Sequence, residues 1–381
     1  MQILLFVLGF GLFLGLVVIH ELGHFIAARR NGVNVKEFGI GFPPRAWARK
    51  LHSGLVLSVN WLPLGGFVRL KGEYDSAAGR GTYGAAPFRA KVKIMLAGVA
   101  ANLVFGLLLL TILAWWGMPK LIGNQFQVAR DTKIIRQEVR IESLQPGSPA
   151  DKAGLKTGDR LVSVSGAEGP IYLKQSSDLP PLGKRYAGQV VQINYEHNGQ
   201  LRSVETRLRT DQEAGGKAYL GVTPYELQIF RSTWSAPIVA LGFTKQLVVL
   251  TFAGLGHALA GLGSTIAGLL TGNHLARLNG QDKATEQVAG PVAIVAILWS
   301  GGSLGLNYML MIIVVISLTL ALMNALPIPA LDGGRLFVSS LFRLMRKPLL
   351  RSTENLIHGL GMAVLLILVL LITVVDVRRF F

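Results

Sequence analysis

The stretch His20-Glu21-Leu22-Gly23-His24 lies near the end of a long apolar run, residues 3–28, and decides how the rest of the chain is interpreted. On a helix, residues four apart share one face, so the two imidazoles can reach one metal ion. Glu21 stands beside them, where it can take a proton from an attacking water. The alternative is two surface histidines on an ordinary helix. Ionisable groups deep in an apolar segment are costly, however, and are by default functional.

A third metal ligand is needed, because a catalytic zinc site takes three from the protein. The chain has no cysteine, so that ligand must be His, Asp or Glu. Asp332 stands out in Asn324-Ala325-Leu326-Pro327-Ile328-Pro329-Ala330-Leu331-Asp332-Gly333-Gly334. The two prolines stop a regular helix, and the two glycines allow a tight turn beside the carboxylate. The other interpretation is that Asp332 only caps a helix starting near Arg335.

The composition is that of a membrane protein. Of the 381 residues, 51% are hydrophobic and only 15% are charged. Soluble domains carry about 25% charged residues, and a disordered chain would need low hydrophobicity, so both classes are excluded. The net charge of +17 would suit a nucleic-acid binder, but in so apolar a chain it sets topology and faces anionic lipid. We therefore expect the lipid bilayer, and no nucleic acid, as a partner.

Four apolar runs are long enough to span a bilayer: residues 3–28, 94–116, 307–326 and 356–375. The first lacks a basic leader and a small-residue cleavage site, which argues against a cleaved signal peptide. We therefore expect about four core transmembrane helices.

The distribution of Lys and Arg predicts the orientation. Residues 29–93 carry 12 basic and 3 acidic residues, and residues 327–355 carry 5 and 2. Both loops should be cytoplasmic, because basic residues accumulate on that side. Residues 117–236, with 16 basic and 12 acidic residues, are far less biased and should lie outside.

Residues 237–305 are harder to assign. Their apolar runs, 247–255, 259–270 and 288–299, are short and interrupted by Gly, His or Lys. This pattern predicts helices on or partly in the outer membrane surface, with two extra spans as the open alternative. A single extra span is rejected, because it would put Asp332 on the wrong side of the membrane for His20.

The insert at residues 125–227 is more charged and has alternating β-type runs. Residues 143–150 followed by 153–166 resemble a PDZ domain: a turn, a short helix ended by Gly154, a tight turn and a strand. Two runs, 190–195 and 203–208, predict a hairpin. The backbone N–H groups of Tyr219, Leu220 and Gly221 are candidates for binding a peptide C-terminus, although the same residues suit an ordinary strand.

These motifs together resemble the site-2 protease family of intramembrane zinc metalloproteases, in its bacterial RseP-like branch with one PDZ domain. Besides residues 20–24 and 324–334, the resemblance rests on Phe38-Gly39-Ile40-Gly41-Phe42-Pro43 and Leu62-Pro63-Leu64-Gly65-Gly66-Phe67-Val68-Arg69-Leu70. Val99 stands where relatives often have proline, and Ala325 replaces a bulkier apolar residue. Neither is a candidate ligand.

The resemblance implies roles for particular residues. His20, His24 and Asp332 would bind Zn²⁺, Glu21 would be the general base, and Asn324 would hold the substrate or stabilise the transition state. Residues 55–70 alternate around Leu-Gly-Gly as a short hairpin would, and the family has membrane-associated β-structure there. An exposed edge at Gly65, Gly66, Phe67 and Val68 would hold substrate as an added strand. The alternative is a cytoplasmic hairpin that only packs.

We therefore expect a polytopic α-helical membrane protein with a membrane-associated β-hairpin and an inserted PDZ-like α+β domain. Its parts would be residues 1–116, 125–227, 237–305 and 306–381. The resemblance implies a protease of the bacterial plasma (inner) membrane, with its zinc site near the cytoplasmic side and its PDZ domain outside. It would cleave transmembrane segments of proteins already trimmed by another protease, such as anti-sigma factors or signal-peptide remnants. The rivals are a non-catalytic PDZ scaffold and a membrane-anchored protease that faces soluble substrates.

Overall fold

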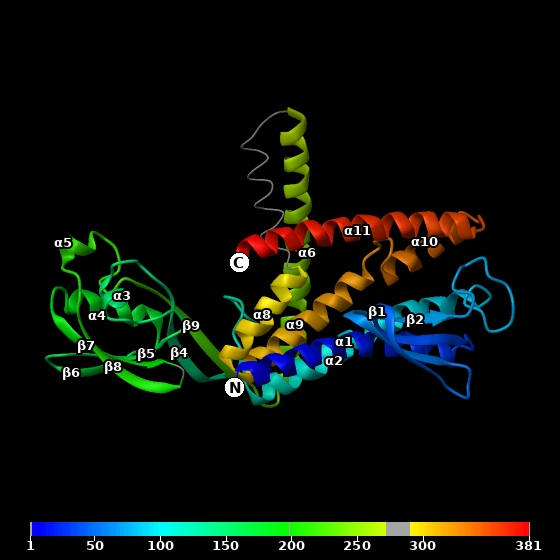
Figure 1. The fold of residues 1–381 in the computed structure, drawn as a ribbon. Coiled ribbons are helices and arrows are strands. Elements are labelled where there is room, and N and C mark those ends of the chain that lie inside the picture. The colour runs from blue at the N-terminus through cyan, green and yellow to red at the C-terminus, as the bar shows by residue number, and fades with distance from the viewer. Residues whose placement is uncertain (1, 198, 272–289, 381) are drawn as a thin grey trace. The chain divides into compact units, whose positions relative to one another are not determined.

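The computed structural model of the protein describes residues 2–197, 199–271 and 290–380 (Figure 1). The chain forms two compact units. The first comprises Met1–Leu113 and Pro237–Phe381, and the second comprises Ala114–Ala236. The segment 125–227, which the sequence suggested as a separate domain, lies within the second unit.

Helices dominate the first unit. They are α1 (Gln2–Arg30), α2 (Phe88–Trp116), α6 (Ala236–Thr271), α8 (Pro291–Leu304), α9 (Leu306–Ala325), α10 (Asp332–Leu344) and α11 (Arg351–Phe380). Within the described residues, five helices are long and apolar enough to cross a membrane. Four of these, α1, α2, α9 and α11, coincide with the four runs predicted from the sequence.

The fifth such helix corrects one expectation. The runs 247–255 and 259–270 were expected to be separate short helices, but both lie in the continuous helix α6. The most apolar 18-residue stretch within Ala236–Thr265 has a mean hydropathy of 1.8. Gly256 and His257 do not interrupt it, because a single glycine inside an apolar helix costs only about 1 kcal/mol. The third run falls partly on α8, and its residues 288–289 lie outside the described part of the chain.

The helices of the first unit pack through apolar side chains and close backbone contacts. Leu16 of α1, Leu298 of α8, and Met309 and Ile313 of α9 are fully buried in one cluster. Two turns further along α1, a Cβ added to Gly23 would lie 2.5 Å from the carbonyl oxygen of Ala97 in α2. Glycine here lets two helix backbones approach, as is common between membrane helices. This close crossing brings α2 beside the histidines of α1.

The two long strands β1 (Val35–Lys50) and β2 (Val56–Leu70) form a separate antiparallel sheet. The turn between them lies at residues 51–55, so the sequence-based placement of the turn at Leu-Gly-Gly was wrong. Ile40 pairs with both Gly66 and Val59. The start of β1 therefore lies between the two halves of β2, and residues 66–70 form an outer strand of the sheet.

The second unit is a seven-stranded sheet with four short helical segments. The strands run in the order β3-β9-β4-β5-β7-β8, with β6 paired to β5. They are β3 (Met118–Pro119), β4 (Lys133–Leu144), β5 (Arg160–Gly166), β6 (Gly169–Tyr172), β7 (Val190–His197), β8 (Gln200–Arg207) and β9 (Val222–Arg231). The helical segments are α3 (Pro149–Lys152), η1 (Ser176–Asp178), α4 (Leu179–Arg185) and α5 (Asp211–Ala214). Its core includes Val139, Ile141, Leu161 and Ile193. Strands β7 and β8 pair as the hairpin that the sequence suggested.

Candidate metal centre and active site

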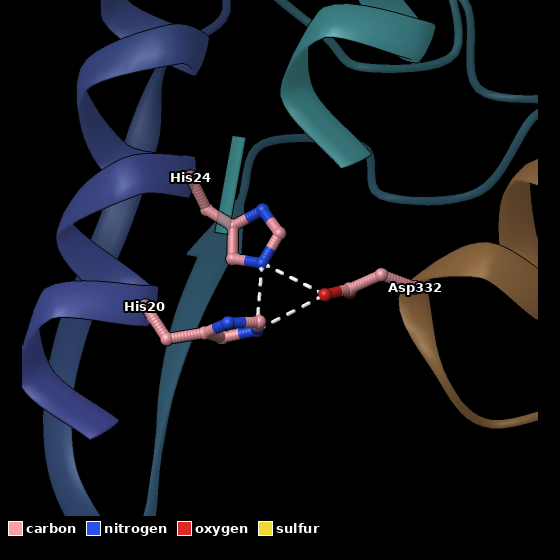
Figure 2. A group of neighbouring side chains, drawn as sticks. All are labelled: His20, His24 and Asp332. Atoms are coloured by element: carbon pink, nitrogen blue, oxygen red, sulfur yellow. Dashed lines mark hydrogen bonds and ion pairs between the residues drawn. The ribbon is translucent and has the colours of Figure 1, made fainter. Parts of the chain in front are cut away.

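Helix α1 presents two histidines from successive turns. His20 and His24 are both buried, and their Nε2 atoms lie 3.2 Å apart (Figure 2). This is the arrangement that the four-residue spacing predicts. It leaves both Nε2 atoms turned toward the same point.

The carboxylate of Asp332 reaches that point from the other end of the chain. Its Oδ2 atom lies 3.0 Å from Nε2 of His20 and 3.0 Å from Nε2 of His24, as Figure 2 shows. Asp332 is the first residue of α10, just after the irregular segment that follows α9. The three residues were predicted to act as one ligand set, and the structure brings them together.

The turn before Asp332 depends on its two glycines. A Cβ on Gly333 would lie 2.4 Å from the carbonyl oxygen of Ala325, and one on Gly334 only 1.9 Å from that of Ile328. Such distances exclude any side chain at either position. Arg335 connects the start of α10 to the loop that follows β2, because its Nη2 donates to the carbonyl of Glu73 at 3.0 Å. The carboxylate is therefore held by backbone packing as well as by its partners.

The three ligand atoms fit a zinc ion. Zinc prefers tetrahedral coordination with bonds of about 2.0–2.1 Å, so its ligand atoms stand about 3.3 Å apart. The observed separations of 3.0, 3.0 and 3.2 Å describe one face of such a tetrahedron. Two imidazoles and one carboxylate are also a donor set that zinc accepts in catalytic sites. The fourth corner is left for water or substrate.

Helix α2 supports the histidines from behind. Nδ1 of His24 lies 2.7 Å from the carbonyl oxygen of Ile94, which accepts its proton and leaves Nε2 free for a metal. A Cβ on Gly98 would stand 2.4 Å from His24 Nε2 and 2.7 Å from His20 Cε1. Only glycine therefore lets α2 pass so close to both rings.

The outer strand of the hairpin reaches the side chain of Glu21. The backbone N–H of Val68 lies close enough to the Glu21 carboxylate to interact with its charge. A Cβ on Gly66 would lie 2.9 Å from Cγ of Glu21, so the strand approaches closely because Gly66 has no side chain. Phe67 and Gly65 contact the sheet itself, through Gly39 and Phe42 respectively. Gly66 and Val68 thus lie at the candidate centre, while Phe67 and Gly65 hold the strand to β1.

Within the described residues, two groups of predicted residues form no hydrogen bond with the three ligands. Asn324 is half-buried in the last turn of α9. Tyr219, Leu220 and Gly221 lead into β9 in the second unit, where their carbonyls accept hydrogen bonds from Arg209, Ala150 and Gln145. Across the described residues, no protein group accepts from the three N–H groups of this loop.

Three further histidines of the chain are His197, His257 and His274. His197 pairs with Asp159, with 2.6 Å between Nδ1 and Oδ1. His257 lies within α6, and His274 falls outside the described residues.

Contacts of α11 with the irregular segment were not foreseen from the sequence. Nδ1 of His358 accepts a hydrogen bond from the backbone N–H of Ala330 at 3.3 Å. A Cβ on Gly361 would lie 2.5 Å from Cβ of Pro329. The spacing of His358 and Gly361, on one face of an apolar helix, was the available signal. It did not indicate which segment that face would meet.

Comparison with known proteins agrees with this geometry. The chain matches the family model described as Peptidase family M50 over residues 8–368. The Zinc metalloprotease RasP of Geobacillus kaustophilus is 25% identical, over 100% of this chain and 98% of that protein. A candidate zinc metalloprotease of Nostoc sp. is 29% identical, over 92% and 90% of the two chains. Another from Clostridium perfringens is 27% identical, over 96% of each.

Among solved structures, the PDZ domain of the SdrC-like protein from Listeria monocytogenes is 24% identical, with a TM-score of 0.21. The match covers 24% of this chain and 92% of that structure. The family match includes both ligand motifs, residues 20–24 and 324–334. It also covers all or part of each of the five apolar helices in the described residues. The chain belongs to peptidase family M50, the site-2 protease family, and is a multi-pass membrane metalloprotease.

Proposed function

We propose that the protein is an intramembrane zinc endopeptidase, which hydrolyses peptide bonds within or near transmembrane segments of other membrane proteins. One observation carries this proposal: the convergence of His20, His24 and Asp332 inside the helical unit. The centre lies between apolar helices and not in a soluble domain, which favours membrane-embedded substrates over soluble ones. It also argues against a non-catalytic scaffold, which has no need of a complete ligand set.

The side chains divide the chemistry among them. When bound, zinc would polarise the scissile carbonyl and lower the pKa of the attacking water. Glu21 accepts the proton of that water and delivers it to the departing amide nitrogen. The Val68 N–H orients the Glu21 carboxylate for this transfer. We assign Asn324 to substrate binding or transition-state stabilisation by family resemblance.

The outer strand of the hairpin is the proposed substrate platform. A transmembrane helix hides its own peptide bonds, so the substrate must unwind locally before it is cleaved. Residues 66–70 have β1 on one side only. The Val68 N–H points toward Glu21, so the backbone of Gly66 and Val68 faces the active site. An unwound substrate pairing along Gly65–Val68 would be held beside the ligands as an added strand.

Removal of the metal is the first test of the proposed function. The purified protein in lipid vesicles should cleave a single-span reporter, lose this activity with a chelator, and recover it with Zn²⁺. A His24→Ala variant should stay inactive after zinc is returned, because one of three ligands is gone. Cleavage that persists in the chelated protein would refute a metalloprotease. Zinc binding without cleavage of any membrane-embedded reporter would favour the scaffold.

We further propose that the second unit is a PDZ-like gate on the outer side of the membrane. Tyr219, Leu220 and Gly221 offer N–H groups for a substrate's new C-terminus, and Gly183 of α4 packs against Tyr219 beside this loop. Gly221 has φ +77° and packs on Ser148, so Gly221→Val should distort the loop. That variant should cleave a reporter with an intact outer domain, whereas wild type and Lys217→Ala should reject it. Equal rejection by Gly221→Val would count against the gate.

The orientation follows from requiring Asp332 and His20 to meet at one membrane depth. We propose a bacterial plasma membrane location with residues 29–93 and 327–355 in the cytoplasm. If α6 crosses the membrane, the chain must cross back before α9 begins. The candidate for this second crossing is α8, which packs against α1 and α9. The 14 residues of α8 extend about 21 Å at 1.5 Å each, so it would enter the bilayer without covering its full thickness.

Single cysteines test this topology cleanly, because the chain has none of its own. In sealed inverted vesicles, Lys50→Cys and Lys347→Cys should react with an impermeant maleimide. Lys217→Cys should react only after the vesicles are opened. All three positions are exposed in the structure. Labelling of Lys347→Cys and Lys50→Cys from opposite sides would overturn the proposed pairing of crossings.

A further inference from the structure

Asn102 of α2 lies next to the metal centre without belonging to the three ligands. It is fully buried, one helical turn after Gly98. Its backbone carbonyl accepts a hydrogen bond from Oγ of Ser317 in α9, at 2.9 Å. Its side-chain amide lies 3.4 Å from Nδ1 of His20. The backbone of Asn102 therefore contacts α9, while its side-chain amide lies beside one ligand ring of α1.

The protonation of His20 makes this contact informative. Nε2 of His20 faces Asp332 and His24, so in a metal-bound site that nitrogen carries no proton. The proton of the neutral ring then sits on Nδ1, which must donate to an acceptor. His24 meets the same need through the Ile94 carbonyl. His20 has Asn102 in the equivalent place.

One orientation of the Asn102 amide pairs its oxygen with the Nδ1 proton of His20. With its nitrogen toward His20, two donors face each other, and Oδ1 of Asn102 is buried with no hydrogen-bond partner. The oxygen and nitrogen of an asparagine amide are assigned from such networks and not observed directly. Rotating the amide by half a turn places Oδ1 against the His20 N–H. In that orientation Oδ1 is no longer an unpaired buried oxygen.

We propose that Asn102 is a positioning residue of the metal centre, whose side-chain oxygen accepts the Nδ1 proton of His20 and so fixes that ring's tautomer and direction. Helix α2 would then orient both histidines, one through a backbone carbonyl and one through a side-chain carbonyl. Partners of this kind typically change metal affinity about 10–100-fold when they are removed. This inference rests on the proposed zinc site.

Zinc affinity of the full-length protein tests the proposal without depending on activity. Competition with a chromophoric chelator would give the zinc dissociation constant of each variant, and the visible spectrum of the Co²⁺-loaded protein would report ligand geometry. Asn102→Leu keeps the approximate volume but removes the acceptor, so zinc binding should weaken about 10–100-fold. Asn102→Asp keeps an acceptor at the same place and should bind zinc as tightly as wild type or more tightly.

Ser317→Ala is the matched control, because among the described residues the Ser317 hydroxyl bonds the Asn102 backbone and no ligand side chain, and its loss perturbs the same helix contact. It should leave zinc affinity and the Co²⁺ spectrum unchanged. Wild-type affinity in Asn102→Leu, or an equal loss in Asn102→Asp, would overturn the proposal. If the leucine variant does not accumulate, Asn102→Ala replaces it with the same expectations. Failure of the wild-type protein to bind zinc would instead refute the proposed function.

Discussion

Replacement of Glu21 by Gln is expected to lower the rate of reporter cleavage by about 10²–10⁴-fold, the usual contribution of a general acid–base group. Glutamine has nearly the same size and can still meet the Val68 N–H through its amide oxygen. It cannot accept the proton of the attacking water. The three ligand residues are untouched, so zinc content should equal that of wild type.

Glu168→Gln is a suitable control for this prediction, since Glu168 is an exposed residue of the second unit whose ion-pair partner, within the described part of the chain, is Arg185. Its activity and zinc content should match wild type. Undiminished cleavage by Glu21→Gln would show that another group moves the proton. Lost zinc together with lost cleavage would mean that Glu21 acts through the structure of the site. Membrane stubs that accumulate in cells with the Glu21→Gln variant would also identify the natural substrates.

The ligands were predictable because their signals are local or compositional. The four-residue spacing of His20 and His24 determines a shared face on any helix. Asp332 lies far away in sequence, but the chain has only 21 acidic residues, and few of them adjoin apolar runs. An acidic residue in a proline- and glycine-rich break at membrane depth is therefore conspicuous. The small number of acidic residues therefore identified Asp332, which residue spacing alone could not do.

The supporting residues were not predictable in the same way, because their roles depend on which helices meet. Gly98 is one of two glycines in the apolar helix α2, and its role becomes visible only when α2 is seen to pass close to the histidines. Ile94 contributes its backbone carbonyl, which every residue has, so its side-chain identity could not reveal this role. The turn of the hairpin was misplaced for a related reason. Leu-Gly-Gly looks like a turn, yet Gly66 lies within β2, where the absence of a side chain leaves room for Glu21. The turn itself contains Gly54, with φ +82°.

Helix α11 illustrates how tertiary contacts extend the site beyond its motifs. His358 and Gly361 contact Ala330 and Pro329, in the segment that leads to Asp332. Ala330 has φ +83°, a left-handed conformation that is strained for a residue with a side chain. The hydrogen bond from the Ala330 N–H to His358 helps to hold this conformation. The position of the third ligand thus depends on the C-terminal helix as well as on α9 and α10.

Gly98→Ala is expected to have the second-largest effect, although it adds only one methyl group. The new Cβ would lie 2.4 Å from Nε2 of His24 and 2.9 Å from Nδ1 of His20, so either α2 or both rings must move. A displacement of about 1 Å at a reacting centre can cost about 10²-fold in rate. We expect a loss of that size in cleavage, together with weaker zinc binding, because Nε2 of His24 is itself a ligand atom.

Gly15→Ala is the matched control, since Gly15 lies on α1 and a Cβ added there has no atom within 4 Å. The same chemical change in an apolar helix should therefore leave zinc affinity and cleavage unaltered. Zinc titration and reporter cleavage of the two variants separate crowding at the ligands from a general effect of losing a helical glycine. Equal behaviour of the two variants would mean that α2 can retreat without disturbing the histidines. A selective loss in Gly98→Ala would show that the close approach of α2 is a condition for holding the metal.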